Sequence, residues 1–166
     1  YNGSIITENA SGADVRITGE TATDYFGYSF ASGDWNADGK TDLIVGSYGY
    51  SSGIGRAYIF YNGSIVTENA SGADIIITGE ASSYFCYSLA SGDFNADGKT
   101  DLAVGANGYS TDTGRVYLFY NDGSIPVTAT AADVIITGET TSNYFGYSLT
   151  SGDFNADGKT DLAVGA

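Results

Sequence analysis

Three short acidic loops carry the side chains of this sequence that are best suited to chemistry. Each loop reads D-x-N-x-D-G-x-x-D, and the loops cover residues 34–42, 93–101 and 153–161. Ca²⁺ takes six to eight oxygen ligands at about 2.3–2.6 Å. Three carboxylates crowded into nine residues repel one another unless a cation neutralises them. The pattern therefore predicts one Ca²⁺ site in each loop, about three per chain.

Five positions of each loop are expected to supply the ligands. The side chains at positions 1, 3, 5 and 9 would contribute oxygens, and the Gly at position 6 would permit the sharp turn. The Lys at position 7 would give its backbone carbonyl while its ammonium points to water. The predicted metal ligands are Asp34, Asn36, Asp38, Lys40 and Asp42, then Asp93, Asn95, Asp97, Lys99 and Asp101, then Asp153, Asn155, Asp157, Lys159 and Asp161.

Two other interpretations of the loops fit the sequence less well. An EF-hand needs Glu at position 12, where this sequence has Val45, Val104 and Val164. Asx-rich turns without metal are the second alternative. Because all three loops keep three carboxylates, a metal site is favoured over metal-free turns.

The rest of the composition excludes several classes of site. The chain has no His and one Cys, so a Ser-His-Asp triad, a Cys-His pair and His-ligated zinc are unavailable. We expect no enzymatic activity, because every Asp cluster fits a metal loop and Glu20, Glu80 and Glu139 recur as turn residues. Cys86 is expected to be a small buried thiol and Trp35 a packing anchor. The many Tyr residues fit either a core or, less favoured, a sugar-stacking surface.

Charge and hydropathy limit the partners. The net charge is −14, which argues against nucleic acid, whose phosphates need a basic surface, and against an anionic membrane surface. No apolar run approaches the roughly 18 residues that a membrane-spanning helix needs, so no membrane insertion is expected.

The loops recur because the whole sequence is repetitive. The segment from Ser91 to Ala106 returns letter for letter from Ser151 to Ala166, and the opening YNGSI returns at Tyr61. We divide residues 1–166, one region, into repeats of about 1–60, 61–119 and 120–166, the last truncated.

Each repeat contains four strand-like segments, at 84–90, 102–104, 115–119 and 134–137 in the fullest copy. The first alternates large and small side chains with a period of two, and Gly, Asn, Asp and Ser separate the segments. Four short antiparallel strands make one propeller blade; a β-solenoid is the alternative. Residues 1–19 are expected to supply a lone fourth strand. The last repeat lacks outer strands, so further repeats or another chain must complete the ring.

These motifs resemble the FG-GAP repeat of integrin α-subunit propellers over essentially the whole chain. Phe145-Gly146 matches "FG" and Val164-Gly165-Ala166 matches "GA", although the Pro is absent in all three copies. The resemblance implies an all-β fold, a β-propeller of four-stranded antiparallel blades that is seven-bladed when complete. It also implies Ca²⁺ in the loops between the first and second strands of the blades. Some fungal relatives are lectins that bind sugars between blades.

The sequence thus predicts a calcium-binding extracellular β-propeller, secreted or at the cell surface. It would act as an adhesion or lectin-like binding module with structural Ca²⁺ and with a protein or carbohydrate ligand on the propeller surface. The alternative is a non-catalytic FG-GAP region of a larger secreted enzyme, such as a hydrolase or lyase.

Overall fold

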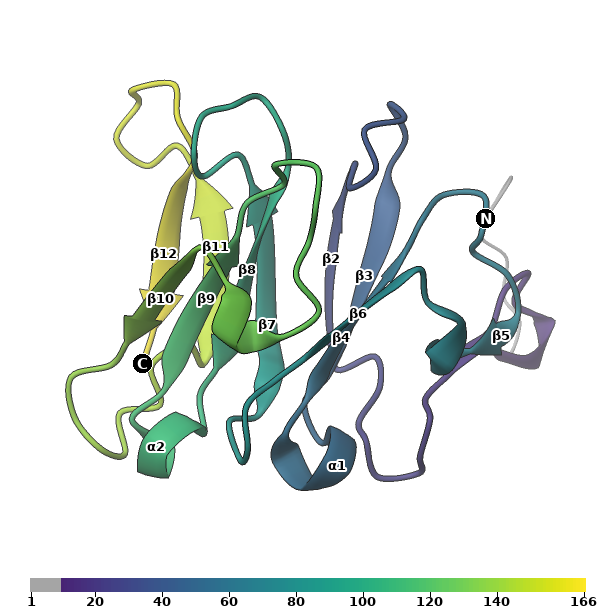
Figure 1. The fold of residues 1–166 in the computed structure, drawn as a ribbon, viewed down its shortest axis with the longest axis horizontal. Helices are drawn as coiled ribbons and strands as arrows, with labels where there is room; N and C mark the ends of the chain where they lie inside the picture. Colours follow the sequence, from purple (N-terminus) through teal and green to yellow (C-terminus); the bar gives the residue numbers. More distant parts are fainter. Residues whose placement is uncertain (1–9) are drawn as a thin grey trace.

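Antiparallel sheets dominate the computed structural model, which describes residues 10–166 (Figure 1). Blade A is a sheet of four strands in the order β2 (Ser29–Gly33), β3 (Asp42–Ser47), β4 (Arg56–Phe60) and β6 (Ile75–Thr78). Blade B repeats this order with β7 (Phe85–Gly92), β8 (Asp101–Ala106), β9 (Arg115–Phe119) and β10 (Val134–Thr137). Half-blade C is the hairpin of β11 (Ser148–Gly152) and β12 (Asp161–Gly165).

The connections hold only short elements. They are η1 (Ala10–Gly12), β1 (Ile17–Thr18), α1 (Tyr50–Gly53), β5 (Glu68–Asn69), η2 (Ala70–Gly72), α2 (Tyr109–Asp112) and η3 (Ala129–Ala131). The predicted all-β fold with four antiparallel strands per repeat is confirmed. The predicted strands at 115–119 and 134–137 coincide with β9 and β10. β7 begins one residue later and ends two residues later than predicted, and β8 extends beyond its predicted range at both ends.

The expected lone fourth strand needs a correction. Its first nine residues lie outside the described part of the chain. Of the remainder, only Ile17 and Thr18 form a strand, which pairs in parallel with Glu68 and Asn69 of the connection after β4. Thr78 and Thr128 form the equivalent parallel bridge one repeat later. In both cases the end of an outer strand therefore contacts the connection after the third strand of the following blade. The sequence of the outer strand alone does not predict this contact.

The main core lies between blades A and B. Blade A contributes buried Ile44, Ile59 and Ile77, and blade B faces them with side chains such as Leu102 and Phe119. A smaller cluster joins blade B to half-blade C, where Leu149 and Leu162 are partly buried. Burial of apolar surface is the main stabilising term of folding, so the blades stabilise one another chiefly through their faces.

Serine hydroxyls join the inner strands β2, β7 and β11, which lie side by side. Ser29 Oγ donates to the Cys86 carbonyl at 2.7 Å, and Ser88 Oγ donates to the Gly146 carbonyl at 2.7 Å. Cys86 has φ +69°, in the left-handed region that favours glycine. Glycine occupies the equivalent position in the other two repeats. Cys86 is fully buried, as predicted.

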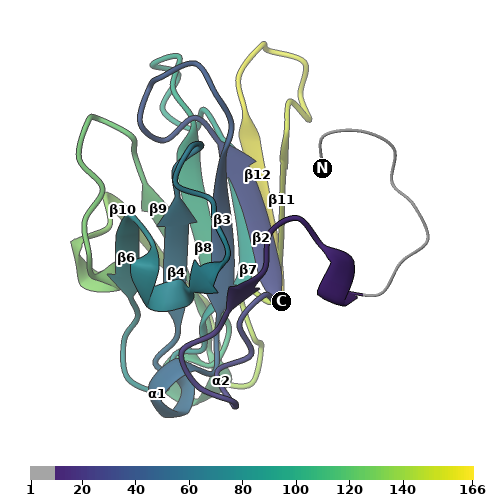
Figure 2. The same cartoon turned by 90° about the vertical axis from the view of Figure 1, so that its right-hand side faces the viewer.

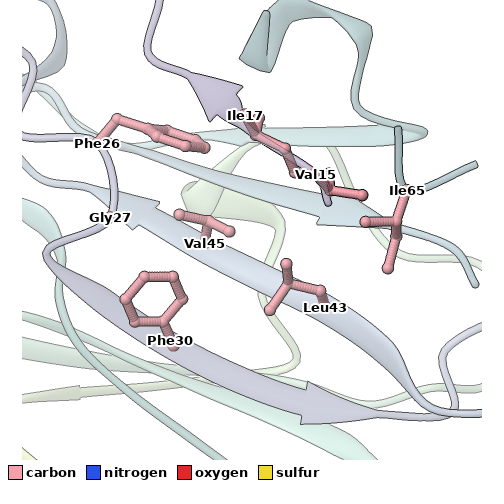
Figure 3. Close-up of a pocket in the computed structure, with 8 residues that line it drawn as sticks. All are labelled: Val15, Ile17, Phe26, Gly27, Phe30, Leu43, Val45 and Ile65. Atoms are coloured by element: carbon pink, nitrogen blue, oxygen red, sulfur yellow. The ribbon is translucent and has the colours of Figure 1, made fainter. Parts of the chain in front are cut away.

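Within residues 10–166, the outer face of blade A carries an apolar hollow (Figure 3). Leu43, Val45 and Phe26 line a hollow of about 360 Å³ together with Val15 and Ile17 from the segment that precedes the blade. The equivalent residues of blade B, which include Leu102, Val104 and Phe85, are buried against blade A. The outer face of blade A therefore has the same apolar character as the face of blade B that packs against blade A.

Candidate functional site

All three acidic loops lie at one end of the molecule. They connect β2 to β3, β7 to β8 and β11 to β12, and they project at the top of both views, opposite α1 and α2 (Figures 1 and 2). Each loop therefore joins the first and second strands of its blade, as the sequence predicted.

The first two ligand candidates of each loop converge on one backbone amide. Asp34 Oδ1 and Asn36 Oδ1 accept hydrogen bonds from the Asp38 N–H at 3.1 and 3.0 Å, while Asp34 Oδ2 accepts from the Gly39 N–H at 2.8 Å. Asp38 Oδ1 accepts from the Lys40 N–H at 2.9 Å. The side-chain oxygens at positions 1 and 3 are thus held near each other by the fold of the loop.

The second and third loops have the same geometry. The shared amides are those of Asp97 and Asp157, each 2.8–3.1 Å from the two oxygens that it meets. Positive φ angles recur at loop position 4, an Ala, and at position 6, the predicted Gly, with 59° at Ala37 and 80° at Gly39. Repetition to this degree shows that the sequence of the loop specifies its conformation.

The aspartate at position 9 anchors the loop to its strand. Asp42 is 1% exposed, and its Oδ2 and Oδ1 accept from the Trp35 and Asn62 amides at 2.8 and 2.7 Å. Asp101 accepts in the same way from the Phe94 and Asn121 amides. Burial raises the pKa of the Asp101 carboxyl above its ordinary value, while these amide donors act in the opposite direction. This structural role was not predicted.

The donor set of the loops fits a hard cation. Only oxygen donors are offered, which suits Ca²⁺ better than zinc, and a carboxylate has about four acceptor positions, so its amide bonds leave room for a metal. The Lys40 side chain is 62% exposed, with Nζ 3.9 Å from Asp38 Oδ2, in keeping with a contribution through its carbonyl. Within residues 10–166, however, no three acidic, His or Cys side chains are gathered into a metal-binding group. Calcium binding therefore remains a prediction.

The tyrosines divide into two groups. Tyr58 and Tyr117 are fully buried, as the core interpretation predicted. Others form a continuous chain of rings, with Tyr48 stacked on Tyr25 at 4.8 Å and Tyr87 at 5.0 Å from the rings on either side of it. We call this chain the tyrosine row; it comprises Tyr25, Tyr28, Tyr48, Tyr84, Tyr87 and Tyr147.

Much of the tyrosine row is open to solvent. Tyr25 is 58% exposed and Tyr147 is 52% exposed. A hollow of about 490 Å³ at the junction of the two blades is lined by Tyr25, Tyr48 and Tyr84. Exposed rings next to hydroxyl groups can stack on and hydrogen-bond to a ligand.

The recurring glutamates were predicted to be turn residues, but two of them form hydrogen bonds and ion pairs between repeats. Glu80 Oε1 accepts from Arg115 Nη1 at 2.9 Å and from the Tyr117 hydroxyl at 2.6 Å. Glu20 accepts from Arg56 and Tyr58 in the same way, both at 2.8 Å. We call this arrangement the Glu-Arg-Tyr latch. The one sequence signal for this latch is that, in two successive repeats, Thr-Gly-Glu is followed later in the chain by Arg-x-Tyr.

Comparison with known proteins agrees with this geometry. The model of the FG-GAP repeat family matches residues 26–60, 85–119 and 145–166. The match covers more than half of the chain and includes all three acidic loops. The chain belongs to the FG-GAP repeat family, and its four-stranded sheets are β-propeller blades.

Similar proteins fall into two groups. The chain is 35% identical to integrin alpha-PS2 of Drosophila melanogaster, with 86% of this chain and 10% of that protein covered, and 38% identical to integrin alpha-7 of Homo sapiens, with 92% and 13% covered. It is 34% identical to phosphatidylinositol-glycan-specific phospholipase D of Mus musculus, with 83% and 18% covered. The chain thus spans less than a fifth of these relatives. No described helix is long and apolar enough to cross a membrane.

Proposed function

We propose that this chain is part of a calcium-stabilised extracellular propeller that acts as an adhesion or lectin-like binding module. The observation that carries the proposal is the threefold acidic loop, whose oxygens at positions 1 and 3 converge in the same way each time. The similarity to integrin α subunits supports an adhesion role and an extracellular location. We propose that Ca²⁺ holds the loops and takes no part in catalysis, and that the chain has no enzymatic activity.

A calcium titration tests the metal part. We expect isothermal calorimetry to give close to three sites per chain, held by side chains of positions 1, 3, 5 and 9 and by the carbonyl of position 7. Binding to the native state adds a stability of RT ln(1 + [L]/Kd), about 2.7 kcal/mol at a hundredfold excess over Kd. Chelator should therefore lower the melting temperature. Fewer than two sites, or equal preference for Mg²⁺, would overturn this part.

The tyrosine row is the surface that we propose for the ligand, which is a protein or a carbohydrate. Glycans stack on aromatic faces, and the exposed rings lie beside hydroxyl groups and the backbone of Gly49 and Gly53. A glycan array read with and without chelator tests the carbohydrate alternative. Binding that a Tyr25→Ala, Tyr84→Ala double variant retains would rule out the tyrosine row as its site.

A second candidate function is that of a non-catalytic region in a larger secreted enzyme. The similarity to phosphatidylinositol-glycan-specific phospholipase D favours it. A catalytic domain next to these repeats in the full-length protein would decide for it, whereas further repeats alone would favour the binding module.

A further inference from the structure

We propose that the tyrosine row is a modification site at which oxidation joins neighbouring repeats covalently through Tyr87. The bond formed is a dityrosine link from Tyr87 to Tyr28 or from Tyr87 to Tyr147. The oxidant is a haem peroxidase acting with hydrogen peroxide. This proposal depends neither on calcium nor on a bound ligand, so its test is independent of the function proposed above.

The fold holds three tyrosines of successive repeats in one line. Tyr28, Tyr87 and Tyr147 each precede a serine at the same position of their repeats, next to or within the inner strands, which lie side by side. Ser29 Oγ donates to the carbonyl of the residue before Tyr87. Ser88 Oγ donates in the same way to the carbonyl of the residue before Tyr147. These two hydrogen bonds fix the spacing from each ring to the next.

The ring contacts of Tyr87 suit coupling. Its ring centroid lies 5.0 Å from that of Tyr28, with the planes at 52°, and 5.0 Å from that of Tyr147, with the planes at 46°. The Tyr87 hydroxyl interacts with the hydroxyls of both neighbours. A dityrosine bond joins the Cε carbons, which are next to the carbon that carries the hydroxyl, so tilted rings with adjacent hydroxyls bring the bonding atoms together. Tyr25 and Tyr48 are stacked at 13° and meet by their faces instead.

Other side chains that oxidise easily are absent from the sequence or buried. The chain has no Met and no His, Cys86 is fully buried, and Trp35 is 3% exposed. Tyr84 stays 41% exposed although connections of both blades adjoin its ring. Its ring lies 6.0 Å from that of Tyr48, which lies 5.2 Å from that of Tyr87. An electron lost at the exposed ring of Tyr84 can therefore be replaced from Tyr87.

The hydroxyl contacts also provide for the proton. The interactions with the Tyr147 and Tyr28 hydroxyls, followed by burial, raise the pKa of Tyr87 above its ordinary value, so Tyr87 loses its proton together with the electron. Two tyrosines each lose one electron and one proton, and their radicals combine through a new Cε–Cε bond. The hydrogens on these carbons then move to the oxygens and restore two phenols. The peroxide takes up the two electrons and two protons and leaves as two water molecules.

The link would fasten blade A to blade B, or blade B to half-blade C. It closes a loop of roughly 60 residues in the unfolded chain, and cross-links of this kind stabilise a fold mainly by restricting the unfolded state. The oxidised chain should therefore have a higher melting temperature than the untreated chain.

Tryptic mapping of the 166-residue chain tests the proposal, because the three tyrosines fall in different peptides. Cleavage after Lys and Arg places Tyr28 in 17–40, Tyr87 in 57–99 and Tyr147 in 116–159. After treatment with a haem peroxidase and hydrogen peroxide, we expect mass spectra of the monomer to show 57–99 joined to 17–40 or to 116–159, with two hydrogen atoms lost. Tyr87→Phe keeps the ring but should abolish both pairs. Tyr144→Phe removes a 42% exposed tyrosine outside the row and should leave both pairs unchanged.

Two further variants separate the two links. Tyr28→Phe should abolish only the pair that contains 17–40, and Tyr147→Phe only the pair that contains 116–159. Persistence of either pair in folded Tyr87→Phe would overturn the proposal. Coupling mainly between 17–40 and 41–56, which carry Tyr25 and Tyr48, would also overturn it, as would equal yields from the native chain and the chain unfolded in urea.

Discussion

At the scale of single residues, the aspartates of the acidic loops have two different structural roles, although they share one residue type. Asp34 and Asp38 lie toward solvent and order the loop, whereas Asp42 is buried with both oxygens bound to backbone amides. An aspartate at position 9 is therefore needed for the fold whether or not a metal binds. The ion-binding role proposed for positions 1, 3, 5 and 9 stays a prediction, and at position 9 it would come in addition to these two amide bonds.

Conservative substitutions in the first loop should show this separation. Asp42→Asn keeps one acceptor oxygen but turns an amide NH₂ toward a backbone N–H, so we expect a loss of about 1–3 kcal/mol in stability without calcium. Asp38→Asn should change stability in chelator by less than about 0.5 kcal/mol and should weaken calcium binding. Urea unfolding in chelator and in calcium measures both effects. Equal loss from both variants in chelator would contradict the assignment.

The buried tyrosines predict a response to alkali. Burial, followed by the hydrogen bond to the latch glutamate, raises the pKa of both Tyr58 and Tyr117 well above the ordinary value. The native state therefore keeps these hydroxyls protonated while the unfolded chain ionises near pH 10. Stability should be fully present below pH 10 and should fall above it by about 1.4 kcal/mol per pH unit for each such group.

A double variant checks the origin of this slope. Tyr58→Phe, Tyr117→Phe should be less stable at neutral pH, because each latch loses its hydroxyl hydrogen bond to the glutamate, but its stability should fall less steeply between pH 10 and 11. Parallel slopes for the parent and the variant in urea unfolding would show that other groups govern the alkaline loss.

At the scale of strands and loops, the first two acidic loops also pack their blade against the next one. Trp35, at position 2 of the first loop, is 3% exposed and belongs to the core between blades A and B. Phe94 is partly buried against half-blade C, and Phe154, at the same position of the third loop, is 60% exposed. The packing role predicted for Trp35 is confirmed, and it depends on the presence of a following blade.

Truncating these rings should have unequal effects. Trp35→Ala should cost about 3–5 kcal/mol, as expected for removal of a large buried aromatic side chain. Phe154→Ala removes a ring at the same loop position that no blade covers, so its effect should stay within about 0.5 kcal/mol. Thermal unfolding of both variants measures the difference, and a similar loss for the two would contradict the packing argument.

The strands were predictable because their signals are local. The segment 84–90 alternates large and small side chains, whereas Arg115–Phe119 and the segment from Asp101 are short apolar runs bounded by turn residues, so the local sequence is enough to predict them. The latch was not predictable in this way, because Glu80 and Arg115 are 35 residues apart and lie on different elements. The parallel pairing of Ile17 with Glu68 depends on the following blade in the same way. The loop pattern predicted that the side-chain oxygens at positions 1 and 3 lie near each other. It did not predict that Asp42 accepts hydrogen bonds from the Trp35 and Asn62 backbone amides.

At the scale of the whole molecule, both flanks of the pair of blades expose apolar side chains within residues 10–166. On the outer face of blade A, Phe30 is 60% exposed, and on β10 of blade B, Ile135 and Ile136 are about 40% exposed. Large apolar patches of this kind mark interaction surfaces or cause association, and unpaired strand edges do the same. That further repeats or another chain complete the ring stays a prediction, as does the number of blades.

The isolated 166-residue chain should therefore self-associate. We expect light scattering to give a mass above 17.2 kDa that increases with concentration. Phe30→Lys places a charge on the apolar face of blade A and should lower the apparent mass, whereas Val127→Lys, an exposed position outside that face, should not. A monodisperse 17.2 kDa particle with native β-sheet signal across the concentration range would contradict this expectation.

Some contacts of one blade are completed only by the blade that follows it in the sequence. The Trp35 indole is covered by blade B, and the Ser29 hydroxyl needs the Cys86 carbonyl. A ribosome delivers residues in order, so the loop of one blade can settle only after roughly 60 further residues have emerged, several seconds at about 5–20 residues per second. During that interval the nascent chain always exposes one indole or phenyl ring and one unbonded hydroxyl, and this most recent blade is the one that a chaperone would meet.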